Sequence, residues 1–376
     1  MSAIYLDHNA TTPLLPEVVD AMLPYLREHF GNPSSGHVYG ARARDGVARA
    51  REQVAALLGC DAGEVLFTSG GTEANNLAIR GVCEAVGGSH VVTSVIEHPA
   101  TARPCAWLER HGRRVSWIGV DGEGRVRVDD ARAAIGADTA LVTVMHSNNE
   151  TGVLQPITEL AEIAHDRGAL VHIDAAQSCG KVPVRVGELG VDLLSVAGHK
   201  LYAPKGVGAL YVRAGTPLAP LVLGAGHERG LRPGTENVAS IVGLGAACEA
   251  ALRDLDAVAA RVRGLRDDLW GRLVRAIPGL ALNGHPELRL PNTLNVRFPG
   301  VSGSDVLAAA PELAASTGSA CHEGHEVASA VILAMGVSRE VALGSVRLTL
   351  GRDTTADDVA RAAEALVRAW RSALGA

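Results

Sequence analysis

The stretch Ser195-Val-Ala-Gly-His-Lys-Leu-Tyr-Ala-Pro-Lys-Gly-Val-Gly-Ala-Leu-Tyr-Val212 holds two apolar runs separated by a loop rich in proline and glycine. Residues 193–196 and 208–213 predict two strands, and Lys200 falls just after the first. α/β enzymes place functional residues at such strand ends. A lysine that is desolvated there has a lowered pKa and is a nucleophile toward aldehydes. Taken alone, however, the turn is better explained by an exposed lysine with His199 as a capping neighbour.

The composition is that of an ordinary soluble protein. The 376 residues suit one large and one smaller domain, with 47% hydrophobic and 20% charged residues. A net charge of -6 and the absence of any Lys/Arg-rich run argue against a nucleic-acid surface. No apolar stretch of 18 residues and no signal-peptide pattern occur in the sequence, so we expect a cytoplasmic protein without membrane association.

Strand and helix patterns alternate over the first two thirds of the chain. Most of the strand runs are continuously apolar, as expected of strands covered on both faces. Helical spacing between them, as in residues 157–167, predicts a mostly parallel α/β sheet. The seven predicted strands are residues 65–68, 90–95, 114–120, 139–146, 169–174, 193–196 and 208–213.

The pattern changes after Gly243, where a long helical stretch, residues 246–277, begins. Short strands and helices follow it, which predicts a second, α+β domain. We therefore assign residues 13–256 to a large domain, and residues 1–12 with 257–376 to a smaller one.

Several polar residues follow the predicted strands. Thr68-Ser-Gly-Gly-Thr72 opens a helix, whose free N–H groups favour an anion such as phosphate. Asp174 ends an apolar strand and needs a partner, since an unpaired buried carboxylate is costly. That partner is either a helix cap or a protonated ring nitrogen. His98 and Asn149 follow strands too, and each is explained as well by a structural or turn role when taken alone.

What these residues share is their position just past the carboxyl ends of strands, which form one crevice in an open α/β sheet. Together they offer a phosphate cradle, a ring that stacks, a carboxylate for a pyridinium and an amine for an aldehyde. Those groups suit pyridoxal 5'-phosphate (PLP). The residues are Gly71, Thr72, His98, Asn149, Asp174, Gln177 and Lys200.

The chain resembles the cysteine desulfurases of the NifS/IscS type, which are PLP enzymes of fold type I in the class V aminotransferase group. The matching stretches span nearly the whole chain in the order of the family, and jointly they are specific although each is weak alone. They are Tyr5-Leu-Asp-His-Asn-Ala-Thr-Thr-Pro13, Thr68-Ser-Gly-Gly-Thr-Glu-Ala-Asn-Asn76, Asn148-Asn-Glu-Thr-Gly152, His172-Ile-Asp-Ala-Ala-Gln177, Gly198-His-Lys200, Arg232-Pro-Gly-Thr-Glu-Asn237 and Gly318-Ser-Ala-Cys321.

The resemblance implies a role for each residue of the crevice. Lys200 would bond to the cofactor aldehyde, His98 would stack on the ring and help proton transfer, and Asp174 would hold the ring nitrogen. Gln177 and Asn149 would lie near the phenolic oxygen, and Asn149 would also lie near the substrate. The phosphate would be bound by Gly71, Thr72 and His199, and by Thr235 from the other subunit of a homodimer. Arg347 would bind the substrate carboxylate.

The resemblance also implies the reaction. L-Cysteine would be converted to L-alanine, with its sulfur carried by Cys321 as a persulfide and then passed to an acceptor protein or small molecule. A selenocysteine lyase with the same apparatus is the nearest alternative. A transaminase would not need a cysteine in a glycine-rich loop, and a non-catalytic scaffold would not need this set of residues.

Cys321 differs from the other five cysteines of the chain. The six have no Cys-x-x-Cys pair, so neither a disulfide framework nor a metal site is predicted. Only Cys321 lies in a stretch rich in glycine and serine, which predicts an accessible sulfur. The neighbouring His322 and His325 would favour the thiolate, its nucleophilic form.

Ala197 departs from the pattern of the family, which usually has a phosphate-binding serine three residues before the lysine. The sequence predicts that this hydrogen bond is lost or is supplied by another donor, such as Ser195 or a water molecule. No second lysine lies in the matching stretches, and Lys205 is the nearby alternative to Lys200.

Overall fold

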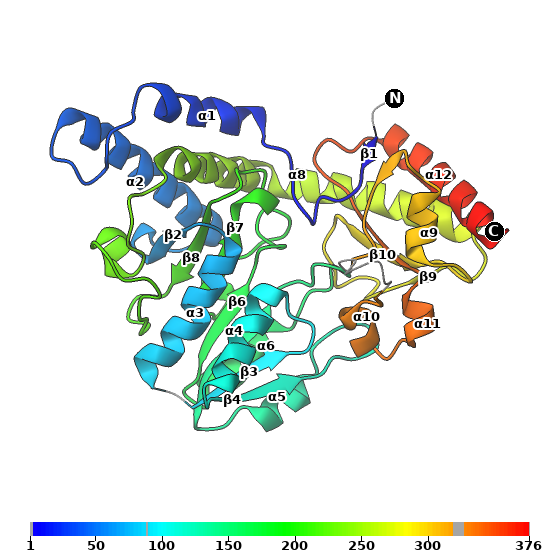
Figure 1. Ribbon diagram of the computed structural model, residues 1–376, viewed down its shortest axis with the longest axis horizontal. Helices are drawn as coiled ribbons and strands as arrows, with labels where there is room; N and C mark the ends of the chain where they lie inside the picture. Colours follow the sequence, from blue (N-terminus) through cyan, green and yellow to red (C-terminus); the bar gives the residue numbers. More distant parts are fainter. Residues whose placement is uncertain (1–2, 88, 319–326, 376) are drawn as a thin grey trace.

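The computed structural model describes residues 3–87, 89–318 and 327–375. Its largest sheet has seven strands in the order β2-β8-β7-β6-β5-β3-β4 (Figure 1). All neighbouring strands pair in parallel except β8, which is antiparallel to β2 and β7. The predicted, mostly parallel α/β sheet is therefore confirmed. The strands are β2 (Val65–Thr68), β3 (His90–Ser94), β4 (Arg114–Ile118), β5 (Thr139–Met145), β6 (Leu170–Asp174), β7 (Leu193–Ala197) and β8 (Gly208–Val212).

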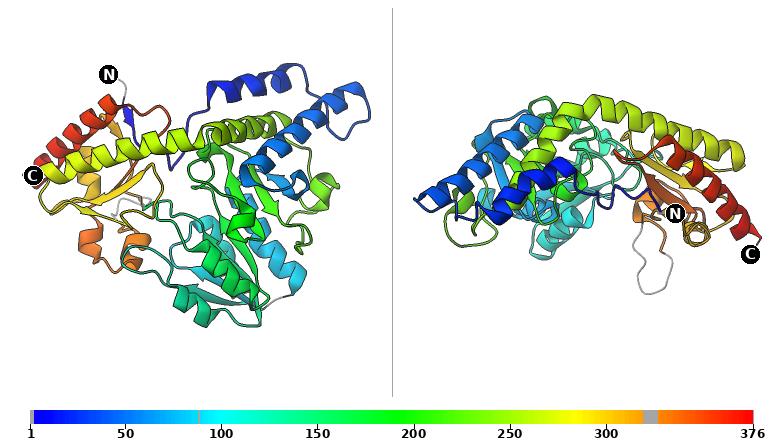
Figure 2. Two further views of the ribbon diagram at one scale, coloured as in Figure 1. Left: turned by 180° about the vertical axis from the view of Figure 1, so that it is seen from behind. Right: turned by 90° about the horizontal axis from the view of Figure 1, so that it is seen from above.

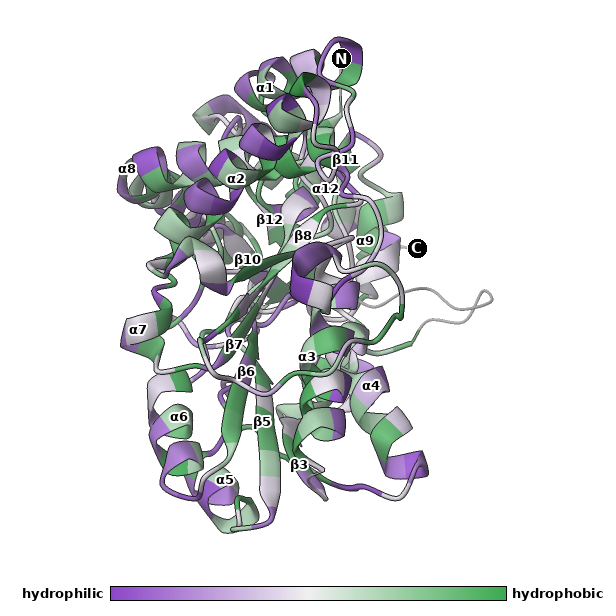
Figure 3. Cartoon of the chain, turned by 90° about the vertical axis from the view of Figure 1, so that its left-hand side faces the viewer, coloured by the Kyte–Doolittle hydropathy of each residue, from purple (hydrophilic) through white to green (hydrophobic). Residues whose placement is uncertain are grey.

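Both faces of this sheet are covered by helices, because successive apolar side chains of a strand point to opposite sides. In β7, Leu193 packs in one core with helices α3 (Gly71–Val86) and α4 (Pro99–Arg110). Leu194 packs in the other core, with α2 (Val38–Leu58) and α6 (Ile157–His165). Figure 3 shows hydrophobic residues along β5 and β6, between helices whose outer faces carry hydrophilic ones.

A smaller part of the molecule is built on the antiparallel sheet β12-β10-β9. Its core also contains the second half of the long helix α8 and the helix α12. The N-terminal strand β1 pairs in parallel with β11, so the start of the chain joins this part. The elements are β1 (Ile4–Tyr5), β9 (Ala281–Leu282), β10 (Thr293–Arg297), β11 (Leu313–Ala314), β12 (Ser345–Thr349), α8 (Val238–Ala276) and α12 (Ala356–Leu374).

The two parts are joined by α8, which runs without a break past residues 256 and 257, where the sequence places the domain boundary (Figure 2). Two short helices near the C-terminal part, α10 (Ala330–Ala334) and α11 (Arg339–Ala342), add side chains to the core of the large sheet instead. The division into 13–256 and 1–12 with 257–376 stays a prediction.

The other helices are short, and within the described ranges no helix is long and apolar enough to span a bilayer. They are α1 (Pro16–Arg27), α5 (Val128–Ala134), α7 (Val186–Leu189) and α9 (Gly303–Ala308).

Candidate active site

A cavity of about 290 Å³ opens at the carboxyl ends of the parallel strands, where the large sheet meets the smaller part of the molecule. Nine of the residues singled out from the sequence line this cavity together. They are Gly71, Thr72, His98, Asn149, Asp174, Gln177, His199, Lys200 and Arg347.

Helix α3 brings its first turn to the cavity through Gly71 and Thr72. A side chain at Gly71 would place its Cβ 3.2 Å from Cβ of Ala197, which is closer than ordinary contact. Glycine therefore allows the helix to start directly against β7. The free backbone N–H groups of this turn and the positive end of the helix dipole suit a phosphate group.

Asp174 is the last residue of β6 and is 7% exposed. Its Oδ2 accepts a hydrogen bond of 2.7 Å from Nδ2 of Asn75 in α3, and its Oδ1 accepts one of 2.9 Å from the backbone N of Ala176. The burial of this carboxylate is thus stabilised by two hydrogen bonds. These contacts hold it at the cavity wall in one orientation.

Lys200 ends the short 3₁₀ helix Gly198–Lys200 that follows β7. Burial lowers the pKa of its amine to about 8; the charge of Asp174 raises it in part, and that of Arg347 lowers it. Across the cavity, His98 caps α4, and its Nδ1 accepts a hydrogen bond from the backbone N of Ala100. Burial and the charge of Lys200 lower the pKa of His98, which favours the neutral ring.

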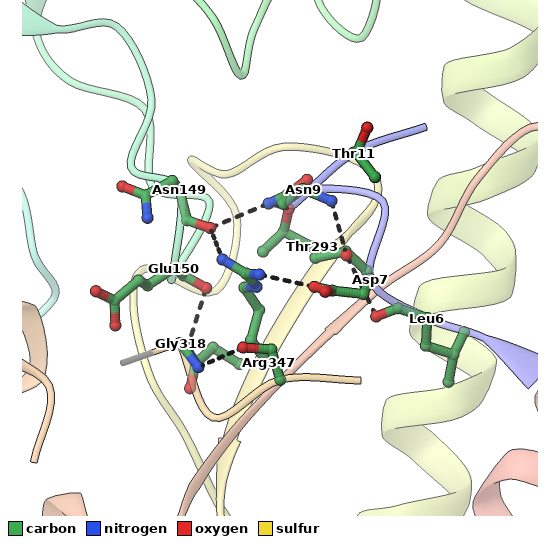
Figure 4. A network of polar contacts seen from close by, with 12 residues as sticks. Leu6, Asp7, Asn9, Thr11, Asn149, Glu150, Thr293, Gly318 and Arg347 are labelled. Carbon is green, nitrogen blue, oxygen red and sulfur yellow. Dashed lines mark hydrogen bonds and ion pairs between the residues drawn. The ribbon is translucent and has the colours of Figure 1, made fainter. Parts of the chain in front are cut away.

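Arg347 reaches the cavity from β12 in the smaller part of the molecule. Its Nη2 pairs with Oδ1 of Asp7 at 2.7 Å, and its Nη1 donates to the backbone O of Asn149 at 3.1 Å (Figure 4). Its Nε is buried and, among the described residues, has no hydrogen-bond partner. These two contacts hold the guanidinium in place, and each Nη keeps a second hydrogen that can donate to an anionic ligand.

Gln177 follows β6 and is held at both ends of its amide. Nε2 donates to the backbone O of Asn9 at 3.0 Å, and Oε1 accepts from Nζ of Lys181 at 3.1 Å. Asn9 is 1% exposed and also donates from Nδ2 to the backbone O of Asn149 at 3.3 Å. The N-terminal segment thus connects two walls of the cavity.

Two predicted residues are not in this group. Thr235 is exposed and does not line the cavity of this chain. Cys321 lies outside the described residues, as do His322 and His325. The suggestion that Ser195 replaces a phosphate-binding serine is not supported, because its hydroxyl bonds Nε2 of His172 at 2.9 Å and it does not line the cavity.

Four residues of the site were missed or undervalued by sequence reasoning: Asp7, Asn9, Asn75 and Lys181. Asp7 and Asn9 lie in the quoted stretch 5–13 and Asn75 lies in the quoted stretch 68–76, but neither stretch by itself singles them out. Lys181 comes four residues after Gln177, and this spacing was an available signal. Because its Nζ contacts two residues that line the cavity, the expectation that only Lys205 is close to Lys200 was wrong.

Comparison with known proteins agrees with this geometry. Residues 4–362 match the family described as Aminotransferase class-V. The chain belongs to the aminotransferase class-V family. This family member is 46% identical over 360 residues to a protein named cysteine desulfurase IscS from Dictyoglomus turgidum, covering 95% of the chain and 91% of the relative.

Solved structures resemble this class-V aminotransferase family member over nearly its full length. One described as a NifS-like protein has a TM-score of 0.92 at 35% identity and covers 97% of this chain and 98% of its own. Another, described as SspA in complex with cysteine, has a TM-score of 0.82 at 33% identity, with 93% and 99% covered. The predicted resemblance to NifS/IscS-type enzymes is therefore confirmed, and so is the fold class.

Proposed function

We propose that this protein is a PLP-dependent L-cysteine desulfurase that forms L-alanine and transfers the sulfur to Cys321. The observation that carries the proposal is the meeting of a buried amine, a carboxylate, a histidine and a helix N-terminus at one cavity. The names of the relatives, cysteine desulfurases at 46% identity, favour L-cysteine over selenocysteine as the substrate.

The donor set of the cavity fits PLP. The first turn of α3 suits its phosphate, the Asp174 carboxylate suits a protonated ring nitrogen, and the amine of Lys200 suits its aldehyde. Within the described ranges, no three His, Cys, Asp or Glu side chains are grouped as a metal ion would need. When bound, PLP supplies an electron sink for the bonds at the substrate Cα.

The residues of the chain then divide the chemistry between them. Lys200 would hold the cofactor through its amine, and the same amine, when free, would take the proton from the substrate Cα. Asp174 would keep the ring nitrogen protonated, since a buried carboxylate stabilises a positive charge beside it. His98 would stack on the ring, and its neutral form could accept a proton. Arg347 would bind the substrate carboxylate through its remaining donors.

The sulfur step belongs to Cys321 in this proposal. Its thiolate would attack the sulfur of the substrate, forming a persulfide while the carbon chain leaves as alanine. The described residues that lead toward Cys321 are close to the cavity, because Ser316 is hydrogen-bonded to the backbone of Arg347. An acceptor protein or small molecule would then remove the sulfur.

A homodimer is part of the proposal, with Thr235 reaching the phosphate in the other subunit. The single chain leaves large apolar side chains on its surface, among them Leu223 at 87% and Phe30 at 74% exposed. Leu223 lies in the loop that leads to Thr235, and such side chains are typical of interfaces. Sedimentation velocity should give twice the mass of the chain; a monomer that is fully active would contradict the role of Thr235.

The proposal is tested by incubating the PLP-loaded protein with L-cysteine or L-selenocysteine and measuring alanine together with sulfide or selenide. We expect alanine and sulfur in equal amounts from L-cysteine. Cys321→Ser should still bind PLP and substrate but should release no sulfide. Mass spectrometry should find the added sulfur on Cys321, with Cys60 as the internal control because it is the only partly exposed cysteine of the described residues. Desulfuration by Cys321→Ser at the wild-type rate would remove Cys321 from the mechanism.

A further inference from the structure

Lysine is rare in this chain, and its few positions are informative. Of the 35 Lys and Arg residues, only Lys181, Lys200 and Lys205 are lysines. Lys200 lines the cavity and Lys205 is an exposed loop residue. Lys181 has no part in the function proposed above and does not line the cavity, yet it contacts residues that do. Arginine is not equivalent to lysine at this position, because the planar guanidinium with its five donors differs in shape from the compact ammonium group of Lys181.

Lys181 contacts two carbonyl oxygens of residues that line the cavity. Its Nζ lies 3.1 Å from Oε1 of Gln177 and 3.4 Å from Oδ1 of Asn9. Gln177 is 4% exposed, and the other end of its amide donates to the backbone O of Asn9. The Gln177 side chain is therefore held between a donor at its oxygen and an acceptor at its nitrogen.

These two partners permit only one orientation of the amide. An ammonium group donates hydrogen bonds and accepts none, so it must face the oxygen, whereas a backbone carbonyl accepts and must face the nitrogen. The NH₂ group has two hydrogens, and the backbone O of Asn9 uses one of them. The second is left for a ligand in the cavity that Gln177 lines.

The electrostatics of Lys181 are consistent with this arrangement. Burial, together with the charges of Lys200 and Arg347, lowers the pKa of its amine to about 7. Below this pH the ammonium form, which can only donate, predominates. A neutral amine still has N–H groups that can donate to Oε1 of Gln177, so Lys181 can hold the amide in the same orientation above this pH.

We propose that Lys181 is a positioning residue that orients the Gln177 amide so that its NH₂ group faces the cavity and donates to an anionic oxygen of the ligand. For the identity of that ligand the inference rests on the proposed function, which makes it the phenolic oxygen of PLP. Lys181 itself would touch neither the cofactor nor the substrate.

The test is a double-mutant cycle on the affinity of the apo protein for PLP, with Lys181→Met, Gln177→Leu and the double variant. Each single variant should bind PLP roughly tenfold more weakly, the value of about one hydrogen bond. Adding Lys181→Met to Gln177→Leu should change the affinity by less than about twofold, because Lys181 acts through Gln177. Lys205→Met is the matched control and should bind like the wild type.

Gln177→Glu tests the donor itself with almost no change in shape. It keeps an acceptor for Lys181 but has no NH₂ group, and its charge repels an anionic oxygen, so it should lose at least as much affinity as Gln177→Leu. The pH midpoint of the absorbance change of bound PLP should rise equally in Lys181→Met, Gln177→Leu and the double variant. Without the donor, the negative charge on the phenolic oxygen is balanced only by the proton on the adjacent nitrogen of bound PLP. That nitrogen therefore keeps its proton to a higher pH.

The possible outcomes separate the alternatives. If Lys181→Met weakens PLP binding equally in the wild type and in the Gln177→Leu variant, the lysine acts by its charge alone and the proposal is overturned. Wild-type affinity in Gln177→Glu would overturn the orientation of the amide. If the wild type itself binds no PLP, the proposed function fails and this inference with it. Melting temperatures of the apo variants within a few degrees of the wild type exclude a loss of folding as the cause.

Discussion

Burial is the largest influence on the pKa of the Lys200 amine and lowers it, together with the charge of Arg347, against the opposing charges of Asp174 and Asp7. With a pKa of about 8, on the order of a tenth of it is neutral at pH 7, far more than for a solvated lysine. Only the neutral amine can attack an aldehyde. Burial of Lys200 therefore prepares its amine for covalent bonding near neutral pH.

Lys200→Ala should abolish covalent attachment of PLP and reduce turnover of L-cysteine by orders of magnitude. After borohydride treatment, the wild type should carry the cofactor mass on the peptide containing Lys200, and the variant should carry none. Lys205→Ala is the matched control, because that lysine is exposed and does not line the cavity. A reduced adduct on Lys181 together with full turnover would show that the assignment is wrong.

Asp174→Asn keeps the shape of the side chain and its neighbour Asn75, but removes the negative charge. Each pKa unit lost at the ring nitrogen is about 1.4 kcal/mol, so we expect activity to fall by at least about a hundredfold. The melting temperature of the apo protein should change little. Steady-state assays of alanine formation check this, and activity within a factor of a few of the wild type would refute the contact.

Sequence reasoning reached Lys200 and Asp174 because each ends an apolar strand, which is a local pattern. It did not reach the pairing of Asp7 with Arg347, whose positions differ by 340 in the chain. No local pattern encodes a contact that depends on how two parts of the molecule meet. The orientation of Gln177 was out of reach for the same reason, since it is fixed by Asn9 and Lys181 together.

At the scale of elements, apolar runs in the sequence located all seven strands of the large sheet. They did not show whether each strand runs parallel or antiparallel to its neighbours. β8 is antiparallel because residues 198–207 are too few for a crossover to a parallel strand. The predicted helix 246–277 begins earlier, at Val238, because the Asn237 side chain caps it. A capping box formed by Thr355 and Asp358 starts α12.

Two of the four glycines in helix α8 have opposite surroundings, so their substitutions make a matched pair. Gly264 is exposed, and an added Cβ would meet nothing within 4 Å, so Gly264→Ala should raise the free energy of unfolding by about 0.5–1 kcal/mol. Gly245→Ala should lower it by about 1–3 kcal/mol, because its Cβ would lie 2.6 Å from Cα of Ala50 in α2. Urea unfolding of both variants measures the difference; equal effects would contradict this packing.

At the scale of the whole molecule, buried ionisable groups set the response of stability to pH. Burial raises the pKa of Glu97 to about 8 and that of Glu150 to about 7. The contribution of these carboxyls to stability is complete below their unfolded pKa of about 4.5 and is lost as the pH rises from there through their folded pKa. Burial lowers the pKa of four histidines to about 4, namely His8, His146, His172 and His199.

The four buried histidines change the free energy of unfolding with pH in the opposite direction to the two carboxyls, and they outnumber them. Their contribution is complete above the unfolded pKa of about 6.5 and is lost as pH falls toward 4. The free energy of unfolding of the apo protein should therefore fall as the pH is lowered from about 6.5 to 5. Each additional proton bound by the unfolded state changes the free energy of unfolding by about 1.4 kcal/mol per pH unit. Urea unfolding at pH 5, 6 and 7 measures this slope, and a flat profile would contradict the neutral state of these histidines.

The continuous course of α8 has a mechanical consequence. Its 39 residues extend about 58 Å, and both cores pack against the same rod. The two parts of the molecule therefore have no flexible joint at residues 256–257, because a hinge there would have to break consecutive backbone hydrogen bonds of the helix. Any widening of the cavity to admit an amino acid must come from movement of the segments that line it, such as the N-terminal segment that carries Asn9.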